Sequence, residues 1–129
     1  MTVPLPEGVI TFPEGLPGFE GCVRYVLMRS SRLDPFVCLR AADQADPAFV
    51  AIAPQTFAPD YNVPLTEADR AKLRIDADAA LLWLVIVNAN VTPPTVNLRA
   101  PIVINAASMV GTQVLTSVAY PIDYPLPRE

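Results

Sequence analysis

The sequence predicts a mostly β protein, a small antiparallel β-barrel-like domain with one short helical insertion. The first observation is fifteen prolines against five glycines in 129 residues. Proline lacks a backbone N–H and breaks helix interiors, so we do not expect long helices. The second is a series of short apolar segments separated by turn residues, as in a chain of strands. The third is a hydrophobic fraction of 52%, enough for a core in one domain over residues 1–129.

The central element is the apolar run Ala79–Val87. It is far shorter than the roughly 20 residues of a membrane span, and its β-branched and aromatic residues favour a strand buried on both faces. Prolines then break the chain before a second segment, Val96–Asn105, and a third strand is expected over Thr112–Thr116. Three apolar strands with short connections predict an antiparallel meander. Pro101 inside the second segment implies either a sheet edge or a bulge.

Four shorter strands are expected earlier in the chain, over Val9–Phe12, Arg24–Arg29, Phe36–Arg40 and Ala48–Ile52. The loop Phe12–Glu20, after the first of them, contains two prolines and two glycines within six residues. Such a composition predicts a fixed, turn-rich loop in which Gly15 and Gly18 hold special backbone angles. Its large apolar residues, Leu16 and Phe19, either fold back onto the core or are presented to a partner.

One helix signal follows. Thr66 is suited to cap a helix, with Asp69 as its capping-box partner, and acidic residues precede basic ones up to Leu73. At the other end of the chain, three prolines favour an extended, polyproline-like tail over Tyr120–Glu129. Its apolar side chains either pack on the domain or bind a partner; they include Ile122, Tyr124 and Leu126.

The formal charge of −4, with 13 acidic and 9 basic residues, argues against direct nucleic-acid binding and suits a basic protein partner. The chain has no histidine, which removes the usual serine triad and the commonest metal ligand. No glycine-rich phosphate loop is present. Asp43 and Asp46 are interpreted as a solvated loop tip rather than a cation site. We therefore expect no catalytic residues, metal site or cofactor, and a binding or regulatory role instead of an enzyme.

The two cysteines, Cys22 and Cys38, each have apolar neighbours. They are either a disulfide or redox pair, or two buried small residues, and the second interpretation is favoured. The first residues lack the basic start and long apolar run of a signal peptide. We therefore expect a cytoplasmic protein with free thiols and no membrane association.

Four stretches, in order along most of the chain, resemble the FliW family of flagellar assembly factors. They are Phe12–Glu20 (FPEGLPGFE), Asp46–Phe49 (DPAF), Pro59–Tyr61 (PDY) and Asn97–Asn105 (NLRAPIVIN), with Gly111–Val114 (GTQV) following at the family's distance. The resemblance implies a cytoplasmic, non-catalytic protein of flagellum biogenesis that binds flagellin and the RNA-binding translational repressor CsrA. When flagellin is exported, the freed factor sequesters the repressor and flagellin translation rises. The alternative is a small β-barrel module that binds a peptide or ligand in an unrelated role.

Two positions depart from the family. Members often place an arginine three residues after the tyrosine near their end, where this chain has Asp123, and a glutamine where Arg40 stands. The residues expected to contact partners come from the family stretches and the tail. They are Leu16, Phe19, Asp60, Tyr61, Asn97, Asn105, Tyr120, Asp123, Tyr124 and Leu126.

Overall fold

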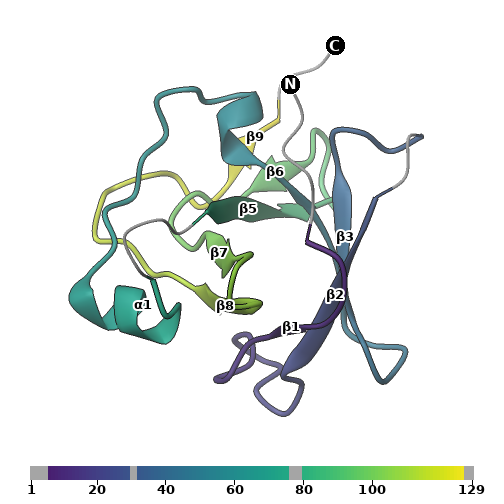
Figure 1. Cartoon of the computed structure of the whole chain (residues 1–129). Coiled ribbons are helices and arrows are strands. Elements are labelled where there is room, and N and C mark those ends of the chain that lie inside the picture. Colours follow the sequence, from purple (N-terminus) through teal and green to yellow (C-terminus); the bar gives the residue numbers. More distant parts are fainter. Residues whose placement is uncertain (1–5, 30–31, 76–79, 127–129) are drawn as a thin grey trace.

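The computed structural model describes residues 6–29, 32–75 and 80–126 (Figure 1). Within them lie one α-helix, α1 (Glu67–Lys72), and one 3-10 turn, η1 (Pro54–Thr56). The strands are β1 (Ile10–Thr11), β2 (Arg24–Arg29), β3 (Val37–Ala41), β4 (Ala48–Ile52), β5 (Leu81–Asn88), β6 (Thr95–Val96), β7 (Ile102–Asn105), β8 (Val110–Gln113) and β9 (Tyr124–Pro125). The predicted short strands are therefore confirmed, two of them, Arg24–Arg29 and Ala48–Ile52, with the same bounds.

Seven of the described strands close into a barrel in the order β4-β3-β2-β1-β8-β7-β5, because β4 also pairs with β5. The closing pair places Ala51 opposite Ile86 and Ile52 opposite Val85. All pairings of the barrel are antiparallel except β1 with β8, which is parallel at Thr11 and Val110. The expected barrel-like fold is confirmed, and closure leaves these seven strands without a long free edge.

The expected meander is present as β5-β7-β8, but the second predicted strand was wrong as a single element. Val96–Asn105 forms two strands, β6 and β7, separated by a turn in which the Arg99 N–H donates to Asn97 Oδ1 at 2.9 Å. Pro101 lies just before β7, outside the ladder that needs its missing N–H. Since β7 pairs regularly with β5 and β8, Pro101 marks neither an edge nor a bulge.

The third strand of the meander is also shifted relative to its prediction. β8 begins at Val110, because the chain reverses tightly after β7. The Met109 N–H donates to the Asn105 carbonyl at 2.8 Å, and Met109 has a positive φ of 58°. Ala79, the predicted start of the central strand, lies outside the described residues, as do residues 127–129 of the tail.

The core has two parts, on opposite faces of β5 and β7. On β5, Leu84 belongs to the cluster inside the barrel, and its neighbour Val85 belongs to a second cluster outside it. On β7, Ile104 and Val103 are divided in the same way. The central strand is therefore buried on both faces at its centre, as predicted. The second cluster also contains side chains from residues 52–75 and from the C-terminal segment.

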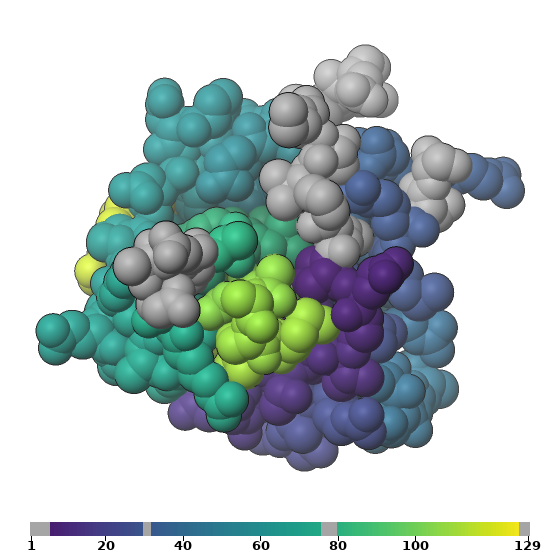
Figure 2. Space-filling model, in the orientation of Figure 1, coloured from purple at the N-terminus to yellow at the C-terminus, as the bar shows by residue number. Residues whose placement is uncertain are grey.

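Helix α1 forms as the sequence predicts. The Asp69 N–H donates to Thr66 Oγ1 at 3.1 Å, and the Thr66 N–H donates to Asp69 Oδ2 at 3.2 Å. No residue of α1 itself is buried, so the helix is anchored by Leu73, which follows it and is fully buried. Figure 2 shows the β7–β8 turn, in light green, between α1 and the N-terminal segment.

Candidate functional site

Residues 116–126, here called the C-terminal strap, run across the outer side of the barrel and form the first candidate surface. The strap is held by backbone hydrogen bonds at its start, middle and end. The Thr116 N–H donates to the Arg99 carbonyl at 3.0 Å, the Leu98 N–H to the Pro121 carbonyl at 3.1 Å, and the Leu126 N–H to the Pro94 carbonyl at 2.8 Å. Its last residues form β9, which pairs with β6. Of the two alternatives for the tail, the structure shows the first for the described residues: the extended segment packs on the domain and ends in a strand.

Aromatic rings fix the strap to the segment that precedes α1. Tyr120 packs on Tyr61 with ring centroids 4.7 Å apart, and Tyr124 stacks on Phe57 at 5.5 Å. The Tyr120 hydroxyl donates to the carbonyl of residue 62 at 3.1 Å and accepts from its N–H at 3.2 Å. The Tyr61 hydroxyl donates to the Leu98 carbonyl at 2.6 Å. Burial, and then the neighbouring Tyr120, raises the pKa of Tyr61 well above its usual value.

The exposed surface of the strap is mixed, and besides Ile122 it includes Val118 at 39% exposure. Ile122 is 61% exposed, and Asp123 and Asp60 are also exposed. The Arg99 guanidinium Nε donates to the Tyr120 carbonyl, so a cation already lies against the strap backbone. This surface can contact a partner through Ile122 and the two carboxylates, while its buried aromatic residues position the backbone that carries them.

The second candidate surface is the loop Phe12–Glu20 with the neighbouring hairpin. Successive turns fold the loop: the Gly15 N–H donates to the Phe12 carbonyl and the Phe19 N–H to the Leu16 carbonyl, each at 2.7 Å. Gly15 and Gly18 have positive φ values of 66° and 87°, as the sequence predicts. Leu16 turns into the barrel and is 2% exposed, whereas Phe19 is 42% exposed and meets Phe49 edge to face at 5.6 Å.

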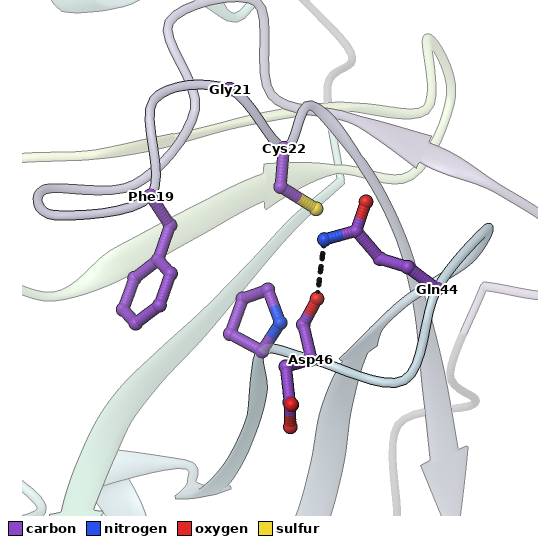
Figure 3. Close-up of a pocket in the computed structure, with 6 residues that line it drawn as sticks. Phe19, Gly21, Cys22, Gln44 and Asp46 are labelled. Carbon is purple, nitrogen blue, oxygen red and sulfur yellow. Dashed lines mark hydrogen bonds between the residues drawn. The ribbon is translucent and has the colours of Figure 1, made fainter.

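A cleft of about 430 Å³ opens between this loop and the β3–β4 hairpin (Figure 3). Its lining residues are Phe19, Gly21, Cys22, Gln44, Asp46 and Pro47. The expected loop between β3 and β4 is confirmed, but Asp43 and Asp46 differ in their surroundings. Arg24 binds both carboxylate oxygens of Asp43 at 2.9 Å, whereas Asp46 lines the cleft.

The structure corrects the expected exposure of several predicted contact residues. Leu16 and Tyr61 are buried, at 2% and 6% exposure, because both are needed to fill the two core clusters. Leu126 is 9% exposed and belongs to the outer cluster. Asn105 is buried at 2%: its Nδ2 donates to the Leu73 carbonyl at 2.9 Å and its Oδ1 accepts from the Ala107 N–H at 3.0 Å. It fastens the end of α1 to β7.

The remaining predicted residues fall into two groups. Phe19, Asp60 and Asp123 are exposed, and Tyr120, Tyr124 and Asn97 are half-buried. Asn97 and the two tyrosines are engaged within the chain, as described above. The structure thus brings Asp60, Tyr61, Tyr120, Asp123 and Tyr124 into the strap region and leaves Phe19 at the cleft. Whether any of them contacts a partner stays a prediction.

Sequence reasoning missed two features. The cleft joins segments some 25 residues apart, and only the β2–β3–β4 pairing brings them together. A second feature is an apolar row across the outer face of that sheet, where Met28 pairs with Cys38 and Cys38 with Val50. Met28 and Val50 are 49% and 43% exposed. The alternation of residues along each strand indicates which side chains share a face of the sheet. It does not indicate which residues of neighbouring strands are paired, and that register creates the row.

Other types of site find little support in the described part of the chain. Over residues 6–29, 32–75 and 80–126, no group of three histidine, cysteine or acidic side chains is placed to hold a metal ion. The two cysteines are free, as expected, but half-buried rather than buried. Among the same residues, none of the helices has the length and apolar character needed to cross a membrane.

These features define a class: a small, closed β-barrel with a short helix and a C-terminal strap packed on one side. A protein-family model described as "FliW protein" matches residues 4–126. A crystal structure of the flagellar assembly factor FliW superposes with a TM-score of 0.85 and 29% identity, covering 92% of this chain and 86% of that one.

Relatives agree with the family model. A flagellar assembly factor FliW from Clostridium botulinum is 34% identical over 126 residues, which cover 95% of this chain and 88% of the relative. One from Thermoanaerobacter pseudethanolicus is 38% identical over 128 residues, covering 96% of this chain and 85% of the relative. The chain belongs to the FliW family of flagellar assembly factors.

Proposed function

We propose that this chain is a flagellar assembly factor that binds flagellin monomers and, when flagellin is absent, sequesters the basic RNA-binding repressor CsrA in the cytoplasm. The observation that carries the proposal is the family match over residues 4–126, together with a barrel that superposes on a FliW structure at a TM-score of 0.85. In this role the protein couples flagellin translation to flagellin export by exchanging partners, and it needs no catalytic residue.

Apolar contact with flagellin is supported by the face of β2, β3 and β4. The row of exposed Met28, half-buried Cys38 and exposed Val50 lies on the outside of the sheet. Exposed apolar groups that are aligned across strands are typical of protein contact surfaces. Flagellin segments that stay unpaired before assembly supply the complementary apolar surface.

Binding of the repressor is supported by charge. An RNA-binding protein presents lysine and arginine to phosphates, and this chain has a formal net charge of −4. Opposite charges accelerate the encounter, and screening limits their reach to about 8 Å at physiological ionic strength. Asp46, Asp60 and Asp123 are exposed in the structure and contribute to this charge; Asp76 and Asp78 lie outside the described residues.

Calorimetry against purified flagellin monomer and purified repressor tests the proposal. We expect 1:1 binding to each, displacement of the repressor by flagellin, and repressor association that slows as salt rises. Met28→Lys should weaken flagellin binding at least tenfold, because it places a charge in the apolar row. Leu115→Lys is the matched control, since Leu115 is 78% exposed and stands outside this row. Absence of heat and of co-elution with both partners would refute the proposed function.

A further inference from the structure

The cleft between the Phe12–Glu20 loop and the β3–β4 hairpin has two chemically different sides. Figure 3 shows Phe19 on the loop side, Gln44 and Asp46 on the hairpin side, and Cys22 between them. The cleft is open to solvent and, at about 430 Å³, large enough for one long side chain and its backbone.

On the loop side, the cleft is bordered by the ring of Phe19, and the position of this residue is fixed by hydrogen bonds and packing. Phe19 donates its N–H to the Leu16 carbonyl at 2.7 Å, and its own carbonyl accepts from the Cys22 N–H at 3.0 Å. Its ring is supported by Phe49, at 5.6 Å and an interplanar angle of 78°. An exposed ring that is braced in this way can receive an aliphatic stem or a cation on its face at little entropic cost.

The hairpin side supplies hydrogen-bond acceptors. Asp46 is the one residue with a formal charge among those that line the cleft. Across the described residues, its carboxylate has no hydrogen-bond or ion-pair partner, and the nearby Arg24 is already bound by Asp43. Gln44 Nε2 donates to the Asp46 carbonyl at 2.6 Å, which holds the hairpin and leaves the Gln44 amide oxygen as a further acceptor.

The exposed Phe19 ring and the unpaired Asp46 carboxylate both border the cleft, and together they match the chemistry of arginine. In Figure 3 the carboxylate points away from Cys22 and Gln44. The planar guanidinium stacks on aromatic rings and binds carboxylates with two N–H groups, and its methylene stem packs on apolar surface. A lysine ammonium satisfies the carboxylate but not the ring in the same way, and an acidic or neutral side chain leaves Asp46 without a partner.

We propose that this cleft is a docking site for an arginine side chain presented by the basic partner protein. The inference rests on the proposed function in taking the repressor as the protein that supplies the arginine. Phe19 holds the stem and one face of the guanidinium, and Asp46 accepts its N–H groups. This contact gives the acidic surface a specific anchor in addition to long-range attraction.

Two measurements on the full chain test the proposal. The first is NMR titration with N-acetyl-arginine amide, with the neutral citrulline analogue as control. We expect saturable shifts confined to residues 19–22 and 44–47, and at least threefold weaker binding in Asp46→Asn and in Phe19→Leu. The second is calorimetry with the purified repressor, in which Asp46→Asn should lose at least fivefold in affinity. Asp34→Asn is the matched control, because it removes the charge of another exposed aspartate that precedes a proline.

The outcomes separate this inference from the proposed function. If arginine amide gives no more shift than citrulline, or if Asp46→Asn binds the repressor as tightly as Asp34→Asn, the docking site is refuted while the proposed function stands. If the arginine titration behaves as expected but the wild-type chain binds neither repressor nor flagellin, the proposed function fails, and with it the assignment of the arginine to that partner.

Discussion

Replacing Gly15 by alanine should destabilise the barrel far more than the same change at Gly18. Both glycines have positive φ values, 66° and 87°, and stand three residues apart in one loop. They differ in the space for a side chain. A Cβ on Gly15 would lie 2.6 Å from the Glu20 Cα and 2.8 Å from the Phe19 carbonyl oxygen, whereas a Cβ on Gly18 would meet nothing within 4 Å.

The magnitudes follow from this difference. Positive φ costs an L-residue about 1–2 kcal/mol, so Gly18→Ala should lose about that much free energy of unfolding. Gly15→Ala adds a steric overlap with backbone atoms, which cannot move aside by changing a side-chain rotamer. Relief requires the turn at Leu16 and Phe19 to open, at the expense of hydrogen bonds worth about 1 kcal/mol each and of part of the Leu16 burial. We expect a loss of about 3–5 kcal/mol.

Urea unfolding followed by the fluorescence of the single tryptophan, Trp83, measures both changes. A matched pair of alanine variants keeps the side-chain chemistry constant, so the difference in midpoint reports the collision alone. Gly18→Val should fall between them, because a β-branched residue is more strained at positive φ than alanine. Equal losses in Gly15→Ala and Gly18→Ala, or an unchanged melting temperature for Gly15→Ala, would refute the reasoning.

Asn105→Ala should lower the free energy of unfolding by about 2–3 kcal/mol in the same urea assay, because it removes the Nδ2 bonds to the Leu73 and Arg74 carbonyls and the acceptor of the Ala107 N–H, and leaves the Leu73 carbonyl only the 3.3 Å bond from Ser108 Oγ; a loss below about 0.5 kcal/mol would contradict this. Deleting residues 120–129 should lower the melting temperature by several degrees, since the strap is packed on the barrel, and Tyr120→Phe alone should cost about 1 kcal/mol through its lost hydroxyl bonds; full stability of the deletion variant would show the strap to be dispensable. Tyr25→Phe should be neutral or stabilising by up to about 1 kcal/mol, because among the described residues the buried Tyr25 hydroxyl has no hydrogen bond of good geometry, although burial and then the neighbouring Cys22 thiol raise its pKa; a clear loss would show that the contact with Cys22 stabilises the fold. Thiol titration in denaturant without reductant should find both Cys22 and Cys38 free, and finding neither would overturn the reduced state.

Tyr124 and Leu126 of the C-terminal strap are among the residues that the sequence predicts to contact a partner. In the structure these side chains belong to the outer core cluster, so truncation removes a structural strand as well as any contact surface. Asp123→Arg remains an informative variant, because Asp123 is exposed and its change alters charge without removing packing. It should change repressor affinity and leave the melting temperature within about 1 °C.

Local chemistry in the sequence was sufficient for much of the fold. The capping box from Thr66 to Asp69, the positive φ of Gly15 and Gly18, and the short strands all follow from residues close together in the chain. The sum of such signals gave a mostly β barrel with one short helix. They succeed because capping, turn geometry and strand propensity are decided within a few residues.

Tertiary structure alone decided which apolar residues are exposed. Leu16 and Phe19 lie three residues apart in one loop, yet one enters the barrel and the other faces the cleft. Pro101 was misplaced, and the alternatives for the tail stayed open, for the same reason, since their surroundings come from strands distant in sequence. Strand register and barrel closure determine these contacts, and both depend on pairing between segments that are distant from one another along the chain. The candidate cleft exists only because that pairing sets the hairpin beside the loop.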